Sequence, residues 1–344
     1  MATATTIAND RVAAPHPASD QAMQAIVQKE YGSADVLSLA EIVRPTIEAG
    51  DVLVQVHAAG LDRGTWHIMA GLPYAGRLAF GLRAPKRAVP GLDLAGVVVE
   101  VGSAVTRFQP GDEVFGIGKG SFAEFAAASE NKLALKPSSL TFEQAAAIPV
   151  SGLTALRGLV EVGHLEAGQH VLIIGASGGV GTFAVQIAKA LGATVTGVAS
   201  TAKVDLVRSI GADHVIDYTE VDFAAGHERY DLILDMAGNS SLSRLRRALA
   251  PHGTLVIGGG EGGGRWVGGI GRQLRAMALS PFIGQRLTSF IAKEDRAGIE
   301  RLAELADDGR IVPALERAYP LAEAPTAMKH LVDGRARGKL VISV

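Results

Sequence analysis

The feature that most constrains this sequence is a glycine-rich loop between an apolar run and a helical pattern. Residues 171–175 (VLIIG) are uninterruptedly apolar, which is typical of a strand buried on both faces of a parallel sheet. The loop 175–181 (GASGGVG) follows, and apolar residues then recur at helical spacing as far as Leu191. Glycines in such a loop let the backbone approach a pyrophosphate at a helix N-terminus. Strand, loop and helix together predict a dinucleotide site.

The same stretch has one alternative interpretation. Residues 167–188 contain no Asp, Glu, Lys or Arg, which would also suit a membrane-spanning helix. Four glycines within seven residues make a poor lipid-facing helix, however. A buried strand followed by a buried helix is therefore the favoured reading, and we expect no membrane span.

The pattern changes along the chain. From residue 24 to about 149, short β-type runs are separated by Gly and Pro, which predicts a mostly β domain. From about residue 170, strands alternate with helical patterns, which predicts a doubly wound parallel sheet and an α/β fold class. The last segment, 338–344 (GKLVISV), is expected to return to the first domain. Residues 1–22, rich in Ala, Thr and Pro, are expected to form a disordered tail without a signal peptide.

Composition excludes several function classes. Lys and Arg total 33 and Asp and Glu total 35, for a formal net charge of −2. A chain with this net charge lacks the excess of positive charge that is typical of proteins that bind nucleic acid or an anionic membrane. The chain has no cysteine, which excludes disulfides, thiolate nucleophiles and Cys-based metal sites. A cytoplasmic location fits this composition.

The second expected strand indicates which dinucleotide binds. NAD sites usually carry an acidic residue at this strand tip to hold the ribose 2′-hydroxyl. Here the tip reads 198–201 (VAST), and Asp205 comes later, as a first-turn helix charge. Ser200 and Lys203 are suited to a 2′-phosphate, although a merely solvated Lys203 is the alternative. We therefore predict NADPH as the cofactor.

Five short motifs carry a family resemblance. They are 58–62 (AAGLD), 90–96 (PGLDLAG), 110–114 (PGDEV), 150–155 (VSGLTA) and the glycine loop. Over about residues 24–344 the chain resembles the medium-chain dehydrogenase/reductase superfamily, and especially its zinc-independent quinone oxidoreductase (zeta-crystallin-like) branch. The resemblance implies a GroES-like catalytic domain (23–149 and 288–344) interrupted by a Rossmann domain (150–287). It also implies a ligand cleft between the domains and a homodimer.

The resemblance extends to individual site residues. Zinc-dependent relatives bind their catalytic metal at the positions of Asp62, Leu92 and Val150, and two of these side chains cannot ligate zinc. A metal-free site is therefore expected. The resemblance implies cofactor-binding residues in three places. In the glycine loop these are Ser177, Gly178, Gly179 and Val180, and around the 2′-phosphate they are Ser200, Lys203, Tyr218 and Arg335. In segments 235–239 and 258–260, beside the nicotinamide, they are Ala237 and Gly258. Ordinary packing at a strand end is the alternative for Tyr218.

The absent metal also bears on the reaction. Hydride transfer to a plain ketone builds charge on one oxygen, whereas a quinone or α,β-unsaturated carbonyl spreads it. We therefore predict a reductase of such apolar, conjugated small molecules, with a simple alcohol dehydrogenase or a non-catalytic NADPH-binding protein as alternatives.

Tyr74 and Asp62 are the catalytic candidates. Packing is the alternative for Tyr74, pairing with Arg63 is the alternative for Asp62, and His67 is expected to be a satisfied loop histidine. The glycine-rich segment 258–271 is either a surface loop or a lid.

Overall fold

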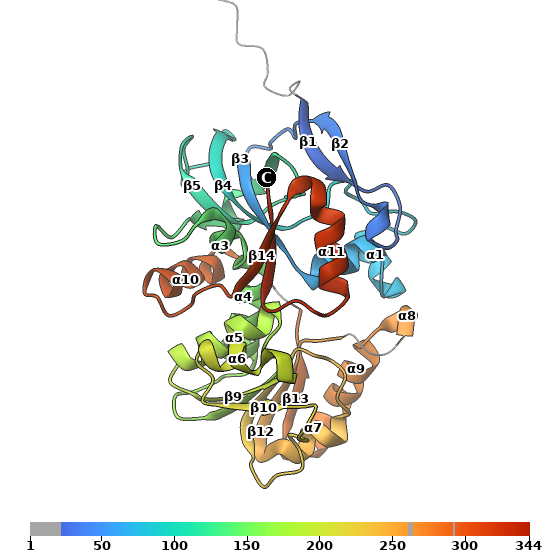
Figure 1. Cartoon of the computed structure of the whole chain (residues 1–344), viewed down its shortest axis with the longest axis vertical. Helices are drawn as coiled ribbons and strands as arrows, with labels where there is room; N and C mark the ends of the chain where they lie inside the picture. Colours follow the sequence, from blue (N-terminus) through green and yellow to red (C-terminus); the bar gives the residue numbers. More distant parts are fainter. Residues whose placement is uncertain (1–21, 261–263, 292) are drawn as a thin grey trace, which may run out of the picture.

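The computed structural model describes residues 22–260, 264–291 and 293–344. It has two lobes stacked along the long axis (Figure 1). The expected tail lies outside the described residues, except that Ala22 already belongs to the first strand. Within the described part of the chain, no helix is long and apolar enough to cross a membrane.

The upper lobe is built on a seven-stranded sheet that is mostly antiparallel. The strand order is β14-β15-β3-β4-β5-β7, with β6 paired to β3, and a separate hairpin joins β1 to β2. Strand β3 is central and almost wholly buried because its apolar residues face covered surfaces on both sides. The strands are β1 (Ala22–Val27), β2 (Ser38–Val43), β3 (Asp51–Leu61), β4 (Asp93–Val101), β5 (Glu113–Ile117), β6 (Phe125–Ser129), β7 (Leu133–Leu135), β14 (Leu315–Pro320) and β15 (Lys339–Ser343).

The lower lobe is built on a six-stranded parallel sheet. The strands lie in the order β10-β9-β8-β11-β12-β13. The chain builds the sheet outward in one direction from β8 and in the opposite direction from β11, as in dinucleotide-binding folds. The mixed α/β class with a GroES-like and a Rossmann part is confirmed. The strands are β8 (His170–Ile174), β9 (Thr194–Ala199), β10 (His214–Asp217), β11 (Tyr230–Asp235), β12 (Leu249–Ile257) and β13 (Arg286–Ser289).

Helices cover both sheets and the junction between them. The α-helices are α1 (Arg63–Ala70), α2 (Arg77–Phe80), α3 (Phe142–Ala146), α4 (Pro149–Leu156), α5 (Gly179–Ala190), α6 (Val204–Ser209), α7 (Leu242–Ala248), α8 (Gly264–Val267), α9 (Ile270–Leu279), α10 (Arg296–Asp307) and α11 (Ala324–Val332). A π-helical turn, η5 (Arg157–Val162), extends α4. The 3₁₀ turns are η2 (Ala34–Val36), η3 (Tyr74–Gly76), η4 (Glu130–Lys132), η6 (Thr201–Lys203), η7 (Ser280–Phe282) and η8 (Leu321–Glu323).

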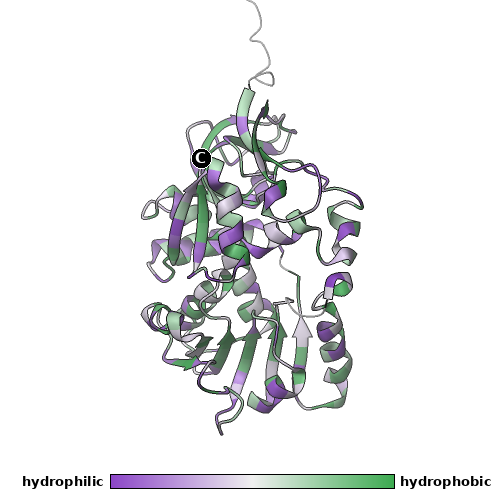
Figure 2. Cartoon of the chain, turned by 45° about the vertical axis from the view of Figure 1, so that its right-hand side comes forward, coloured by the Kyte–Doolittle hydropathy of each residue, from purple (hydrophilic) through white to green (hydrophobic). Residues whose placement is uncertain are grey.

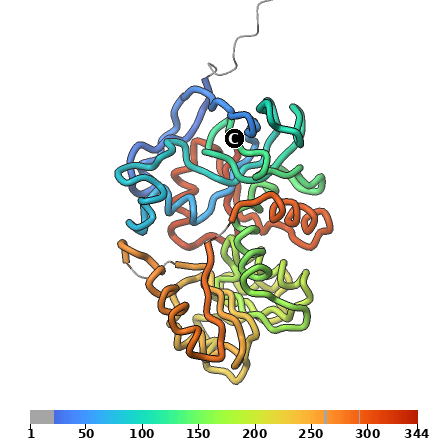
Figure 3. The backbone as a smooth tube through the Cα atoms, turned by 180° about the vertical axis from the view of Figure 1, so that it is seen from behind, coloured from blue at the N-terminus to red at the C-terminus, as the bar shows by residue number. Residues whose placement is uncertain are grey.

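One apolar core joins the two lobes. The largest buried cluster contains upper-lobe residues such as Phe115 together with lower-lobe residues such as Phe183. Helices α4 and α10 lie at this junction (Figure 1). The chain after β13 returns to the upper lobe, as the view from behind shows (Figure 3). Strand β13 pairs in register with β12 as far as Ser289, so the boundary expected after residue 287 would cut a strand. We propose a boundary after Ser289 and keep the others as predicted.

Candidate cofactor and active site

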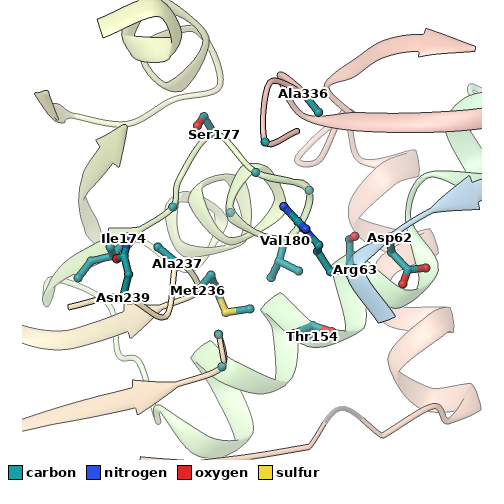
Figure 4. A pocket seen from close by; sticks show the side chains of 18 of the residues that line it. Asp62, Arg63, Thr154, Ile174, Ser177, Val180, Met236, Ala237, Asn239 and Ala336 are labelled. Carbon is teal, nitrogen blue, oxygen red and sulfur yellow. The ribbon is translucent and has the colours of Figure 1, made fainter. Parts of the chain in front are cut away.

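A cavity of about 830 Å³ lies between the lobes. It sits at the carboxyl ends of β8 and β11, where the strand order reverses, which is where ligands bind in open α/β sheets. The glycine loop, the turn after β11 and segment 258–260 supply its lower wall, and residues 61–67 of the upper lobe face them. Figure 4 shows these elements converging on the cavity.

The glycine loop forms a cradle for phosphate. Gly178 is the N-cap of α5, no side-chain hydrogen bond caps this helix, and its first residues, Gly179, Val180 and Gly181, line the cavity. A Cβ built on Gly178 would meet only the Gly175 carbonyl, at 3.4 Å, so the space beside it is open. A Cβ on Gly181 would instead collide with Gly175, because helix and strand pack closely there. The loop therefore fits the diphosphate of a dinucleotide.

The far end of the cavity is closed by the chain entering β15. The Gly338 N–H donates to the Ser177 carbonyl at 3.0 Å. Lys203 Nζ donates to the carbonyls of Ala336 at 2.7 Å and Gly334 at 3.0 Å. Burial lowers the pKa of Lys203. Ser200 and Tyr218 line the same end, whereas Arg335 is exposed and lies outside the lining.

The turn after β11 is held from below by a buried ion pair. Arg272 Nη1 lies 2.7 Å from Asp235 Oδ2, and the same guanidinium donates to the carbonyls of Ser240 and Gly259. Asp235 Oδ1 in turn accepts from the Gly238 N–H. One arginine thus fixes both segments expected beside the nicotinamide. Ala237 and Gly258 line the cavity here.

The two catalytic candidates occupy different positions. Asp62 lines the cavity and is the N-cap of α1: its oxygens accept from the Thr65 N–H at 2.8 Å and the Thr65 hydroxyl at 3.2 Å. Tyr74 is not among the lining residues. Its ring packs edge-on against Trp266, with centroids 5.3 Å apart. This contact is what the packing alternative predicts for Tyr74, and a catalytic role for the residue stays a prediction.

Residues beside Asp62 enter the cavity as well. Arg63 extends toward Val180, whereas the Asp62 carboxylate points the other way (Figure 4). His67 also lines the cavity. Its Nδ1 lies 2.8 Å from the Leu72 carbonyl, so the ring has a hydrogen-bond partner, although His67 belongs to helix α1 and not to a loop.

A buried charge cluster lies directly behind the lining. Lys339 Nζ donates to Ser151 Oγ at 3.1 Å and lies 3.5 Å from Asp93 Oδ2. Asp93 and Lys339 are almost completely buried. Burial raises the pKa of Asp93 to about 7, Lys339 opposes this rise, and Asp62 adds to it. Ser151 lines the cavity, so this cluster reaches the site from the upper lobe.

Comparisons with known proteins agree with this geometry. Family models match residues 48–138 as an alcohol dehydrogenase GroES-like domain and residues 210–342 as a zinc-binding dehydrogenase. The mouse protein (Mus musculus) named mitochondrial NAD(P)H oxidoreductase RTN4IP1 is 35% identical, over 94% of this chain and 89% of its own length. The chain belongs to the medium-chain dehydrogenase/reductase superfamily.

Other members of the superfamily are similar in sequence or structure. An Arabidopsis thaliana protein named chloroplastic NADPH-dependent alkenal/one oxidoreductase is 33% identical, over 93% of this chain and 79% of its own length. The solved quinone oxidoreductase of Coxiella burnetii superposes with a TM-score of 0.83 at 28% identity, covering 94% of this chain and all of that one. The predicted quinone oxidoreductase-like branch is confirmed, and this dehydrogenase/reductase is an oxidoreductase with a nicotinamide cofactor.

The second family description names zinc, but the described residues of this member of the superfamily offer no group of ligands for it. Leu92 and Val150 are half-buried and pack against the apolar core. In the part of the chain that the structure describes, no three His, Cys, Asp or Glu side chains gather into a metal-binding group. The metal-free site stays a prediction.

Several lining residues of this dehydrogenase/reductase were not predicted as site residues. They include Arg63, Ser151, Thr154, Asn239, Arg244 and Phe290. Ser151, Thr154 and Asn239 belong to recognised motifs or segments, but a single sequence does not show which of their side chains faces a cavity. Arg63 directly follows a recognised motif, and Arg244 and Phe290 belong to none. Of segment 258–271, residues 258–260 line the cavity, 264–267 and 270–271 are helical, and 261–263 lie outside the described residues.

Proposed function

We propose that this chain is an NADPH-dependent oxidoreductase that reduces quinones or α,β-unsaturated carbonyls without a metal ion. The observation that carries the proposal is the interlobe cavity, with a phosphate cradle at the N-terminus of α5 and apolar residues at the expected ligand positions Leu92 and Val150. The names of the Arabidopsis and Coxiella relatives support these substrate classes, and the name of the mouse relative supports a nicotinamide cofactor.

A conjugated acceptor suits the charges around the cavity. The cofactor, when bound, supplies a hydride, and the protein must stabilise charge that develops on the acceptor's oxygen. Arg63 brings a guanidinium into the cavity, and we propose it as the group that stabilises this charge. Asp62 accepts two hydrogen bonds from Thr65, so its proposed role is to fix the start of α1 and thereby position Arg63. Tyr74 remains only an alternative proton donor, from its place at the rim.

NADPH is the proposed form of the cofactor. Ser200, Lys203 and Tyr218 line the end of the cavity where the second strand of the sheet ends, and no carboxylate stands at residues 198–201 to hold a 2′-hydroxyl. Arg335 lies next to two lining residues, and movement of its exposed side chain would bring a second cation to the phosphate.

A homodimer and a cytoplasmic location belong to the proposal as well. The family resemblance supports the dimer, which light scattering on the purified chain tests directly. The mouse and Arabidopsis relatives carry mitochondrial and chloroplastic in their names, so imaging of a tagged chain in its own cells must test the location.

Turnover on a substrate panel tests the function. Quinones, enones, aldehydes and alcohols are each offered with NADPH or NADP⁺, and nicotinamide absorbance is followed. We expect oxidation of NADPH with quinones or enones. Turnover of alcohols alone would establish the alcohol dehydrogenase alternative, and binding of NADPH without turnover of any class would contradict an enzymatic role. Arg63→Met, with Arg63→Lys as the charge-conserving control, should lower kcat far more than the affinity for NADPH.

A further inference from the structure

The rim of the cavity carries an unusual concentration of exposed apolar side chains. Of the eighteen large apolar residues that are exposed in the described parts of the chain, nine lie in two segments, 78–82 and 266–291. Trp266 is 76% exposed and Leu78 is 78% exposed. The others are Leu82, Val267, Ile270, Leu274, Met277, Phe282 and Ile291. Contiguous exposed apolar surface usually marks an interaction site.

The second segment contacts the residues just before the first, beside the cavity. The Tyr74 ring packs against Trp266, and α8 contacts η3. The Gly269 N–H donates to the carbonyl of Gly260, which itself lines the cavity. We call residues 72–87 and 264–279 the cleft rim. Figure 1 shows α8 below α1, with α9 running down the same side of the molecule.

Helix α9 presents an exposed apolar face within the cleft rim. Ile270, Leu274 and Met277 are exposed and recur at spacings of four and three residues, which places them on one side of the helix. Ala276 is buried, and the guanidinium of Arg272 is held on the inner side by Asp235. In Figure 2, in which this side comes forward, α9 lies at the right with strongly apolar and strongly polar residues along it.

The charge of these segments has one sign. Residues 63–92 and 264–293 contain no Asp or Glu, in a chain that has 35 acidic residues. Five exposed basic side chains lie in the cleft rim: Arg83, Lys86, Arg87, Arg265 and Arg275. None of the five forms an ion pair with another described residue. A positively charged surface of this kind repels the same surface of a second copy in a two-fold interface. It attracts a negatively charged surface.

We propose that the cleft rim docks on the surface of an anionic lipid bilayer. Apolar side chains on one helix face, an exposed tryptophan, and cations with no ion-pair partner among the described residues are the features of a peripheral membrane-binding surface. The chain would lie on the bilayer with Trp266 and the outer face of α9 among the headgroups. The mouth of the cavity would then open toward the apolar phase. This docking goes beyond the proposed reaction and does not depend on it, because it needs no turnover.

Co-sedimentation with vesicles tests the docking. The whole chain is mixed with vesicles of phosphatidylcholine containing phosphatidylglycerol, or with vesicles of phosphatidylcholine alone. We expect binding to the anionic vesicles only, weakened by salt because the attraction is partly electrostatic. Trp266 is one of two tryptophans, and its emission should shift to shorter wavelength on binding.

Matched triple variants locate the surface. Arg83→Gln, Lys86→Gln and Arg87→Gln together should reduce affinity for anionic vesicles roughly a hundredfold. The control removes three exposed arginines from α6 and α10, on the other side of the molecule, as Arg208→Gln, Arg296→Gln and Arg301→Gln. These residues are exposed, so both triples should keep the parent's circular dichroism spectrum. The control should bind like the parent.

Three outcomes would overturn the proposal. The first is that the parent does not bind anionic vesicles. The second is that the control triple loses as much affinity for these vesicles as the rim triple. Alternatively, Trp266→Ser with Leu274→Ser would convert a dimer to a monomer in light scattering, which would make the cleft rim a subunit interface instead. Loss of enzyme activity in any of these variants would not bear on the result, because vesicle binding is measured without substrate.

Discussion

Replacing Lys339 with Met tests the buried charge cluster behind the cavity. The substitution keeps an unbranched side chain but removes the ammonium group that lies 3.5 Å from Asp93 Oδ2. Both partners are almost completely buried. Removing one member of such a pair costs about 3–5 kcal/mol, because the remaining charge has no compensation. We therefore expect Lys339→Met to lower the free energy of unfolding by an amount in this range above neutral pH.

The pH dependence distinguishes this mechanism from a simple packing defect. Burial raises the pKa of Asp93 to about 7, from an ordinary value of 3.8. Between these values the folded chain holds a proton that the unfolded chain has released. The free energy of unfolding therefore falls by about 1.4 kcal/mol per pH unit as pH rises, and in the parent this fall ends near pH 7.

Loss of the ammonium charge raises the pKa of Asp93 further, so in Lys339→Met the fall continues above pH 7. The gap between parent and variant should then widen by about 2 kcal/mol between about pH 7 and about pH 8.5.

Urea unfolding followed by circular dichroism measures this gap. The parent and Lys339→Met are compared at about pH 6 and about pH 8.5. The same pair is then compared in an Asp93→Asn background, where no carboxyl titrates and the gap should be independent of pH. A gap in the parent background that is equal at the two pH values would refute the argument. So would a gap that widens equally in the Asp93→Asn background.

Three further predictions concern the cofactor and metal. Gly178→Val should abolish NADPH binding but leave the melting temperature unchanged, because Gly178 has an ordinary φ of −83° and open space beside it; calorimetric titration and a thermal melt check both, and unchanged affinity would show that the loop is not the site. Lys203→Ala should weaken NADPH roughly tenfold or more and hardly change NADH, since only NADPH carries the 2′-phosphate; equal weakening of both in fluorescence titrations would make Lys203 a structural residue. Elemental analysis should find no stoichiometric zinc, and one zinc per chain, lost together with activity, would contradict the metal-free site.

The sequence predicts the parts of this protein whose signals are local. The apolar run before the glycine loop and the helical spacing after it lie within about twenty residues, and together they predict β8, the loop and α5. The motif containing Asp62 was recognised, and this residue does line the cavity. Its role as a helix N-cap depends on the Thr65 N–H, a contact three residues away that the sequence also contains.

The return of residues 338–344 to the first domain was predicted and is seen in the pairing of β15 with β3, but individual side-chain contacts between distant segments were not predicted. Asp93 and Lys339 are fully buried partners, yet almost the whole lower lobe lies between them in the sequence. A charged residue at the start of each apolar strand is the one signal that the sequence offers, and it does not identify the partner. Tyr74 shows the same limit. Its sequence neighbours give no sign that its ring packs against Trp266, which comes from the other lobe.

Net charge illustrates why a sum over the sequence can mislead. The formal charge of −2 suggests no attraction to an anionic surface. A bilayer, however, responds to the charge within about a Debye length, roughly 10 Å, and not to the total. Residues 63–92 and 264–293 lack acidic side chains, and the fold brings parts of both to the mouth of the cavity, where Tyr74 meets Trp266. The acidic residues that make the net charge negative lie elsewhere in the sequence. They weaken the positive potential at the cleft rim only where the fold brings them within a Debye length of it. The vesicle experiment therefore tests whether the local field or the total charge governs this surface.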